Sequence, residues 1–96
     1  MEAASKSAFQ VAIEGPAVAV TNVSGKPASD LTVTLVGSDG SRHSARLLDA
    51  VGPGEVVLVP FGEFEPEVPD NTKVVRAEVQ TGSAGTRHRW VVWLSD

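Results

Sequence analysis

Short runs rich in valine and threonine, separated by glycine and proline at intervals of roughly ten residues, make up most of this sequence. Nine glycines and six prolines among 96 residues leave few stretches long enough for a helix. Valine and threonine are stiff at χ1 and are favoured in strands. We therefore expect an all-β fold.

A chain of 96 residues and 10.0 kDa has room for one hydrophobic core. We expect residues 8–96 to form this domain and residues 1–7 to be a flexible lead-in rather than a signal peptide. The longest apolar runs, 56–61 and 90–94, are far shorter than the roughly 20 residues of a membrane helix, so no direct membrane insertion is expected. The absence of cysteine excludes disulfides, thiolate metal sites and a cysteine nucleophile.

The turn-forming residues divide the sequence into seven expected strands. Their predicted ranges are 9–13, 17–22, 31–36, 42–48, 56–61, 73–80 and 87–94. Seven short strands in about 90 residues are typical of a single immunoglobulin-like (Ig-like) antiparallel β-sandwich.

The turn at Asp39-Gly40 permits two registers between its flanking strands. A two-residue turn would place Arg46 opposite Val33 on the core face, where burial of an unpaired charge is costly. A three-residue loop with Gly40 in the left-handed conformation shifts the pairing by one residue. Leu31, Val33 and Leu35 then lie opposite Leu47, Ala45 and His43. We prefer the second register because it buries no charge.

The last two strands are expected to form a hairpin with a four-residue loop, 82–85, that pairs Thr81 with Thr86. One face would be apolar, with Val79, Ala77 and Val75 opposite His88, Trp90 and Val92. The other face would carry a charge pair between Glu78 and Arg89. A slip by one residue would mix the two faces, so the pattern predicts which side chains point inward.

Two segments resemble parts of a known class of module. Residues 20–35, VTNVSGKPASDLTVTL, resemble the "strand, Asn-x-Ser-Gly-x-Pro, strand" opening of bacterial extracytoplasmic Ig-like modules of the FxLYD and CARDB types. Residues 52–61, GPGEVVLVPF, look like the "Pro-Gly-Glu, apolar strand" step of the same modules. The Phe-x-Leu-Tyr-Asp string itself is missing. The resemblance implies a non-catalytic, extracytoplasmic (periplasmic or cell-surface) module of an exported or membrane-anchored bacterial protein, with further domains in a possible parent chain.

The sequence offers no pattern for catalysis, so we expect neither an enzyme nor a cofactor. His43 and Ser44 are neighbours in an expected strand and point to opposite faces, and no Gly-x-Ser-x-Gly turn is present. Both histidines, His43 and His88, fall on inward faces near strand ends. The expected role of each is a hydrogen bond to a loop.

Between residues 55 and 70 the chain carries five acids and no base. Three of the acids are spaced by two, so an extended backbone would align them, and calcium prefers such oxygen ligands. The candidate ligands are Glu63, Glu65, Glu67 and Asp70. No Asp-x-Asp-x-Asn-Gly loop is present. We therefore expect a solvated acidic loop with Phe64 in the core and keep calcium as an alternative.

A small basic patch is expected on the outer face of the C-terminal hairpin. Its members are Arg76, Arg87, Arg89 and Arg42. Glu78 lies among them, and the whole chain has a formal charge of −4. Because binding to phosphates needs several uncompensated cations, we expect no nucleic-acid partner.

Two tryptophans give the strongest functional indication. Trp90 and Trp93 are three residues apart in an expected strand, so they lie on opposite faces. Trp90 belongs to the core face, whereas Trp93 shares the outer face with Val91 and Val74, beside Arg76. Exposed apolar patches mark interaction sites, and tryptophan and arginine anchor many protein interfaces. The predicted partner-binding residues are Trp93, Val91, Val74 and Arg76.

We therefore predict an interaction or structural module that contacts a protein partner or a second copy through this face. Another part of the chain covering the face is one alternative. A small ligand-binding module, for calcium through the acidic loop 55–70 or for carbohydrate through Trp93, is the other. An open sheet edge is a further potential contact, because it can add a strand from a partner, but the sequence does not determine which edge is free.

Overall fold

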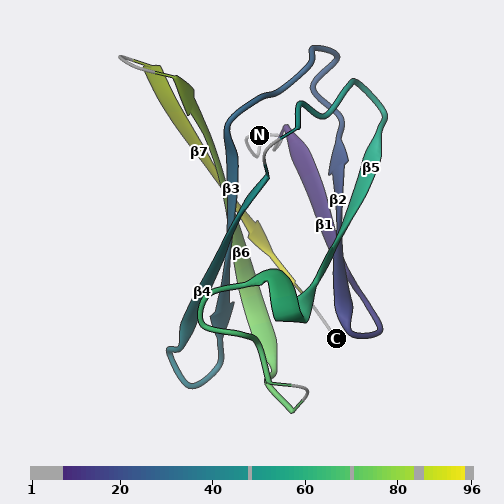
Figure 1. The fold of residues 1–96 in the computed structure, drawn as a ribbon. Helices are drawn as coiled ribbons and strands as arrows, with labels where there is room; N and C mark the ends of the chain where they lie inside the picture. The colour runs from purple at the N-terminus through teal and green to yellow at the C-terminus, as the bar shows by residue number, and fades with distance from the viewer. Residues whose placement is uncertain (1–7, 48, 70, 84–85, 95–96) are drawn as a thin grey trace, which may run out of the picture.

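The computed structural model describes residues 8–47, 49–69, 71–83 and 86–94, and it describes the backbone alone for residues 82, 83 and 86–88. The expected lead-in, residues 1–7, lies outside this description. Seven strands form two antiparallel sheets that face each other as two layers (Figure 1). The predicted all-β, sandwich-like architecture is confirmed. The described residues contain no helix long and apolar enough to cross a membrane.

The strands divide unequally between the two sheets. The three-stranded sheet has the order β1-β2-β5, with β1 (Phe9–Glu14), β2 (Ala17–Asn22) and β5 (Val56–Pro60). The four-stranded sheet has the order β4-β3-β6-β7, with β4 (Arg42–Leu47), β3 (Leu31–Gly37), β6 (Val74–Ser83) and β7 (Thr86–Trp93). A short 3-10 helix, η1 (Phe61–Glu63), follows β5.

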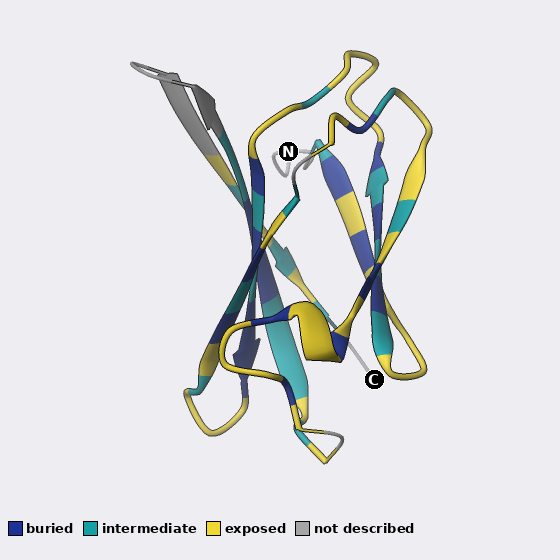
Figure 2. Cartoon of the chain, in the orientation of Figure 1, coloured by how far each residue is buried: buried dark blue, intermediate teal, exposed yellow. Residues whose placement is uncertain are grey.

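The core lies between the two sheets. Figure 2 shows buried and more exposed residues alternating along the strands. In β3, the inward side chains Leu31, Val33 and Leu35 are fully buried, as the alternation of apolar residues and threonines predicts. Burying one such side chain stabilises the fold by about 1.5–3 kcal/mol. The fully or nearly fully buried apolar residues are Phe9, Val18, Val20, Leu31, Val33, Leu35, Val51, Phe64, Val68, Ala77 and Val79.

The register between β3 and β4 is the one predicted from charge burial. Leu31, Val33 and Leu35 pair with Leu47, Ala45 and His43. Gly40 has φ +88°, the left-handed conformation that the three-residue loop requires and that a residue with a Cβ rarely adopts. Arg46 therefore points outward, opposite Thr32.

The predicted register between β6 and β7 is wrong by two residues. The strands extend further than expected, so that Ser83 pairs with Thr86 and Thr81 pairs with His88. A shift by two does not by itself move a side chain to the other face, because side chains alternate with a period of two. It changes the cross-strand neighbours, however, and Trp93 lies opposite Arg76.

The Asn-x-Ser-Gly-x-Pro segment owes its shape to a buried asparagine. Asn22 is fully buried, and its Nδ2 donates to the carbonyl oxygens of Lys26 (2.7 Å) and Val51 (2.8 Å). Its Oδ1 accepts from the backbone N–H (2.9 Å) and the hydroxyl (2.7 Å) of Ser24. One side chain thus ties together two loops at the same end of the sandwich.

The segment after β5 closes the other end of the space between the sheets. Phe61, Phe64 and Val68 turn inward and are buried, which confirms the prediction for Phe64. The backbone of Glu65 forms two hydrogen bonds with that of Ser44 in β4, at 2.8 and 3.1 Å. The acidic segment is therefore anchored to the four-stranded sheet.

Candidate functional site

The two tryptophans of β7 lie on opposite faces of the sheet, as predicted. Trp90 is partly buried against the core, and its ring meets that of Phe9 edge to face with centroids 5.3 Å apart. Trp93 is 70% exposed, and Val91, on the same face, is 44% exposed. We call Val91, Trp93 and Arg76 the indole strip.

Arg76 places a positive charge over one side of the exposed indole ring of Trp93. It lies directly opposite Trp93 across the strand pair, and its guanidinium carbon is 5.4 Å from the centre of the indole ring. At this distance a cation is attracted to the face of the aromatic ring. The strip therefore combines an exposed apolar ring with a positive charge.

Val74 departs from its predicted place on the outer face. It packs against the core at the start of β6, opposite Gly37, where the register of β3 and β6 shifts. The expected strip is therefore shorter by one valine. Val74 and Trp93 still line one depression, together with Ile13, Phe61 and Leu94, on the side of the molecule where the ends of β1 and β7 lie.

Glu78 sits at the centre of an arginine cluster on the outer face of the four-stranded sheet. Its carboxylate accepts a hydrogen bond from Arg42 (2.9 Å) and lies 3.2 Å from Arg76 and 3.6 Å from Arg89. The predicted pair with Arg89 forms diagonally, because Val91 lies directly opposite Glu78. The carboxylate also keeps Arg76 in place beside the indole of Trp93.

Burial of Glu78 opposes its ionisation, but the hydrogen bond from Arg42 and the charges of Arg42, Arg76 and Arg89 outweigh burial and lower its pKa. Arg46 pairs with Asp30 at 3.6 Å at the margin of the same face. Four described arginines therefore meet two carboxylates, and this face is positive on a chain of net charge −4. The side chain of Arg87, the other predicted member of the patch, lies outside the described part.

Replacing Glu78 with glutamine is expected to reduce the loss of stability in acid. Because the pKa of Glu78 is lower in the folded chain than in the unfolded chain, its ionised form stabilises the fold above the ordinary glutamate pKa. That contribution disappears as the pH falls through the folded-state pKa. Between about pH 6 and about pH 3, the melting temperature of Glu78→Gln should therefore fall less than that of the wild type. The exposed Glu67→Gln serves as the control, and equal slopes for the two variants would contradict this role of Glu78.

The described residues of the acidic segment lack the alignment on which the calcium alternative depends. Glu63 lies in η1 rather than in extended backbone, so the spacing by two no longer aligns it with Glu65 and Glu67. Within the described residues, no three acidic or histidine side chains gather closely enough to hold a metal ion. Asp70, the fourth candidate ligand, lies outside the described residues.

His43 has the role predicted for it. It is buried near the end of β4, where Nδ1 donates to the carbonyl oxygen of Pro66 (2.8 Å) and Nε2 lies 3.2 Å from the Ser41 hydroxyl. Ser44, on the opposite face, hydrogen-bonds to Thr34 at 2.9 Å. The contact with Pro66 anchors the segment after β5. The side chain of His88 lies outside the described residues.

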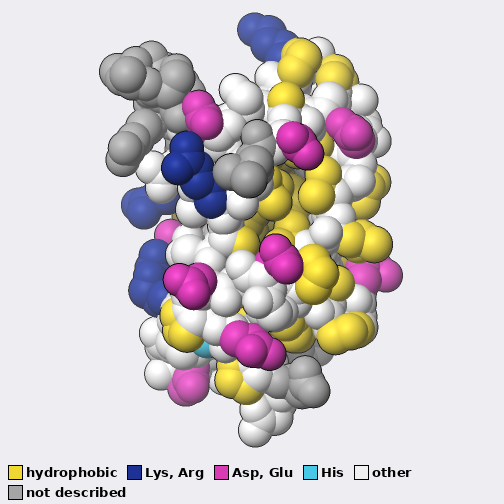
Figure 3. Space-filling model, in the orientation of Figure 1, with side chains coloured by type: hydrophobic (Ala, Val, Ile, Leu, Met, Phe, Trp, Pro, Cys, Tyr) yellow, Lys and Arg dark blue, Asp and Glu magenta, His cyan; other side chains and the backbone are white. Residues whose placement is uncertain are grey.

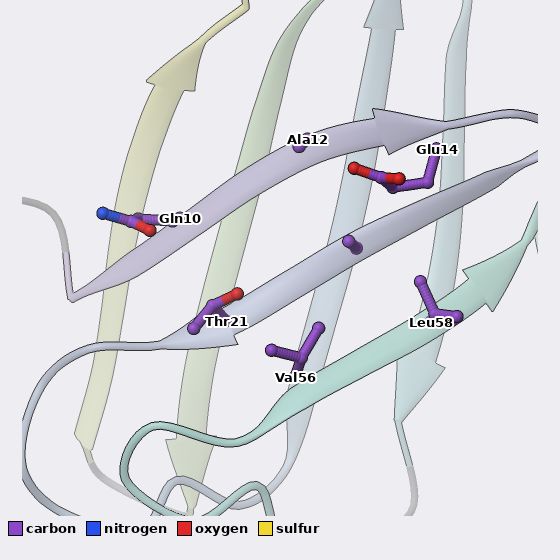
Figure 4. A pocket seen from close by; sticks show the side chains of 7 residues that line it. Gln10, Ala12, Glu14, Thr21, Val56 and Leu58 are labelled. Atoms are coloured by element: carbon purple, nitrogen blue, oxygen red, sulfur yellow. The ribbon is translucent and has the colours of Figure 1, made fainter.

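A second apolar surface, which the sequence reasoning missed, covers the outer face of the three-stranded sheet. Val56 and Leu58 of β5 are 55% and 61% exposed. Beside them, small or polar side chains of β1 and β2 floor a shallow depression (Figure 4). The lining residues are Gln10, Ala12, Glu14, Ala19, Thr21, Val56 and Leu58. The sequence signal was the apolar run 56–61, because a strand that is apolar on both sides needs a cover on both sides.

The comparisons with known proteins gave no match: no family model, no curated protein and no solved structure is similar to the chain at a significant level. The class of protein is therefore defined by the fold and its surfaces. The chain is an all-β protein of two antiparallel sheets, with exposed apolar side chains on the outer face of each sheet.

Proposed function

We propose that the chain is a non-catalytic Ig-like interaction module of an exported or membrane-anchored bacterial protein, located outside the cytoplasm. It contacts a protein partner or a second copy of itself through the indole strip. The strand order supports the Ig-like part of this proposal. In the constant-type Ig sandwich, the fourth strand lies on the edge of the sheet formed by the first, second and fifth strands. Here the fourth strand, β4, borders β3 instead, and the other six strands keep that arrangement.

The single observation that carries the proposal is the exposure of Trp93 beside Val91, with Arg76 lying over its ring. Covering a tryptophan side chain removes roughly 150–250 Å² from water. At about 25 cal/mol per Å², covering the exposed part of the ring favours binding by about 3 kcal/mol. A contribution of this size is typical of the few residues that dominate the affinity of an interface.

The arginine cluster supports a contact at the same place. Arg42 and Arg89 keep more than half of their side chains exposed while sharing one carboxylate with Arg76. Charges around an apolar centre steer association and select the partner more than they add affinity. An apolar centre with a charged border is also the usual anatomy of a protein interface.

Trp93→Ala is expected to weaken association at least tenfold while leaving the fold intact, because the indole contributes its apolar area to the partner rather than to the core. Two assays measure the effect, each in a Leu58→Lys background that removes pairing through the exposed strand β5: sedimentation velocity over a range of concentrations for self-association, and capture of proteins from a bacterial envelope extract by the immobilised domain. Thr32→Ala, on the same outer face two strands away, is the matched control and should behave like the wild type.

In the Leu58→Lys background, association that Trp93→Ala retains in full would contradict the proposal, as would the absence of association by the Leu58→Lys parent in both assays. A rise in melting temperature on adding millimolar calcium, abolished in Glu63→Gln/Glu65→Gln, would instead favour the ligand-binding alternative.

A further inference from the structure

The strand β5 differs from the other edge strands of the two sheets in carrying no charge. The edges of the sheets are β1, β5, β4 and β7. β1 contains Glu14, β4 contains Arg42 and Arg46, and β7 contains Arg87 and Arg89, whereas β5 reads VVLVP. Charged residues on edge strands prevent unwanted pairing with other chains, and an uncharged, apolar edge is the kind that accepts another strand.

The hydrogen bonds at both ends of β5 reveal which of its backbone groups face the open edge. The N–H of Asn22 donates to Glu55, and the N–H of Phe61 donates to Pro16, so residues 55 and 61 are bonded toward β2. Because hydrogen-bonded and free residues alternate in an antiparallel pair, residues 57 and 59 are also bonded toward β2. The N–H and C=O groups of Val56 and Leu58, and the C=O of Pro60, therefore point away from the sheet.

The side chains of the same two residues extend the open edge into an apolar surface. Val56 and Leu58 stand on the outer face of the three-stranded sheet (Figure 4). In the space-filling view, hydrophobic side chains gather on the half of the molecule that this sheet occupies (Figure 3). A strand added beside β5 would cover the apolar side chains of Val56 and Leu58 and would also form hydrogen bonds with their outward N–H and C=O groups.

We propose that β5 pairs antiparallel with β5 of a second copy and joins two three-stranded sheets into one continuous sheet. With the two-fold axis at Val57, Val56 of each copy lies opposite Leu58 of the other. The outward N–H and C=O groups of these two residues then form a complete set of four hydrogen bonds, and their side chains form two apolar cross-strand pairs. Pro60, which has no N–H, lies outside the paired segment and ends it.

A second copy suits this edge better than an unrelated strand for two reasons. The pairing is self-complementary, because the same short segment supplies matching donors, acceptors and apolar side chains on both sides of the axis. The Glu55 carboxylate, the nearest acid in sequence, accepts a hydrogen bond from the backbone N–H of Gly52 at 2.6 Å within its own chain, so it does not lie free at the edge. The contact is short, and we expect a dimer that dissociates on dilution.

A cysteine scan tests the register directly, because the chain has no cysteine of its own. In the proposed pairing, the two copies of residue 57 form a non-hydrogen-bonded pair with Cα atoms about 4.5 Å apart, a separation that a disulfide spans. Val57→Cys should therefore give a disulfide-linked dimer under mild oxidation. Gln10→Cys is the control at an exposed position on the far edge strand β1, and it should cross-link several-fold more slowly although Gln10 is more exposed than Val57. Equal or faster cross-linking of Gln10→Cys would overturn the proposal.

A charge substitution tests the same contact without a covalent cross-link. Leu58→Lys should weaken the dimer at least tenfold in sedimentation equilibrium, whereas Gln10→Lys adds the same charge to the same outer face on β1 and should leave it unchanged. Either substitution makes the chain less negative and so reduces the charge repulsion between two copies. If overall charge alone controlled the dimer, both variants would associate more strongly than the wild type. Circular dichroism checks that each variant is folded. A wild type that stays monomeric at high concentration, or a dimer unaffected by Leu58→Lys, would overturn the proposal. Trp93→Ala should leave this dimer intact. The proposal for β5 and the proposal for the indole strip can therefore be confirmed or contradicted separately.

Discussion

Phe64→Ala is expected to lower the free energy of unfolding by about 3–5 kcal/mol, the usual cost of removing a fully buried phenylalanine. Phe64 is 2% exposed and packs in the core with Phe61 and Val68, although it lies in an acidic segment outside the strands. The truncation removes apolar burial and leaves a cavity at the end of the sandwich. It also weakens the attachment of this segment to β4, which depends on the Glu65–Ser44 backbone pair. Chemical denaturation measures the loss.

The matched control is its neighbour Glu63→Ala, which removes an exposed side chain from the same segment. Surface changes of this kind alter stability by about 0.5 kcal/mol or less. Phe64→Leu, which keeps most of the apolar volume, should fall between the two. A Phe64→Ala variant as stable as Glu63→Ala would mean that the segment does not seal the core.

Trp90→Ala is expected to cost about 3 kcal/mol, near the lower end of the range for large aromatic residues because Trp90 is only partly buried. The indole meets Phe9 of β1 edge to face and thereby joins the two sheets across the core. Its removal leaves Phe9 without its aromatic neighbour on β7. A double-mutant cycle of Trp90→Ala with Phe9→Leu measures the coupling, which should reach about 0.5–1.5 kcal/mol for an aromatic pair. Additive effects would show that the ring contact does not stabilise the fold.

The β3–β4 hairpin shows where sequence reasoning succeeds. Its two possible registers differed by one residue, and one of them placed Arg46 on the core face. Because burial of an unpaired charge costs several kcal/mol, the physical penalty selected the register that the structure has. The same register placed His43 inward near a strand end, whereas the alternation of side chains along the last strand placed Trp93 outward.

The β6–β7 hairpin shows where the same reasoning stops. Registers that differ by two residues keep every side chain on the same face, so apolar alternation cannot distinguish them. The difference lies in cross-strand pairs, here Arg76 with Trp93 and Glu78 with Val91. The shift between Val36 and Gly37 that brings Val74 against the core is likewise a property of the assembled sheet.

The exposed face of β5 was missed for a different reason. An apolar run such as 56–61 predicts burial on both faces, but whether a cover exists depends on which strands the chain places on that side. The sequence also left open which sheet edge is free. The topology shows that β5 is one of the four edge strands, because β4 pairs with β3 and not with β5.

The central claim is that the two faces of β7 differ in character, one closing the core and the other offered to a partner. The difference in free energy of unfolding between Trp90→Ala and Trp93→Ala, measured by chemical denaturation of the monomer, tests it most directly. We predict a loss of about 3 kcal/mol for Trp90→Ala. For Trp93→Ala, we predict a loss of at most about 1 kcal/mol, from the contact with Arg76. Equal losses for the two variants would place both indoles in the interior and contradict the proposed contact surface.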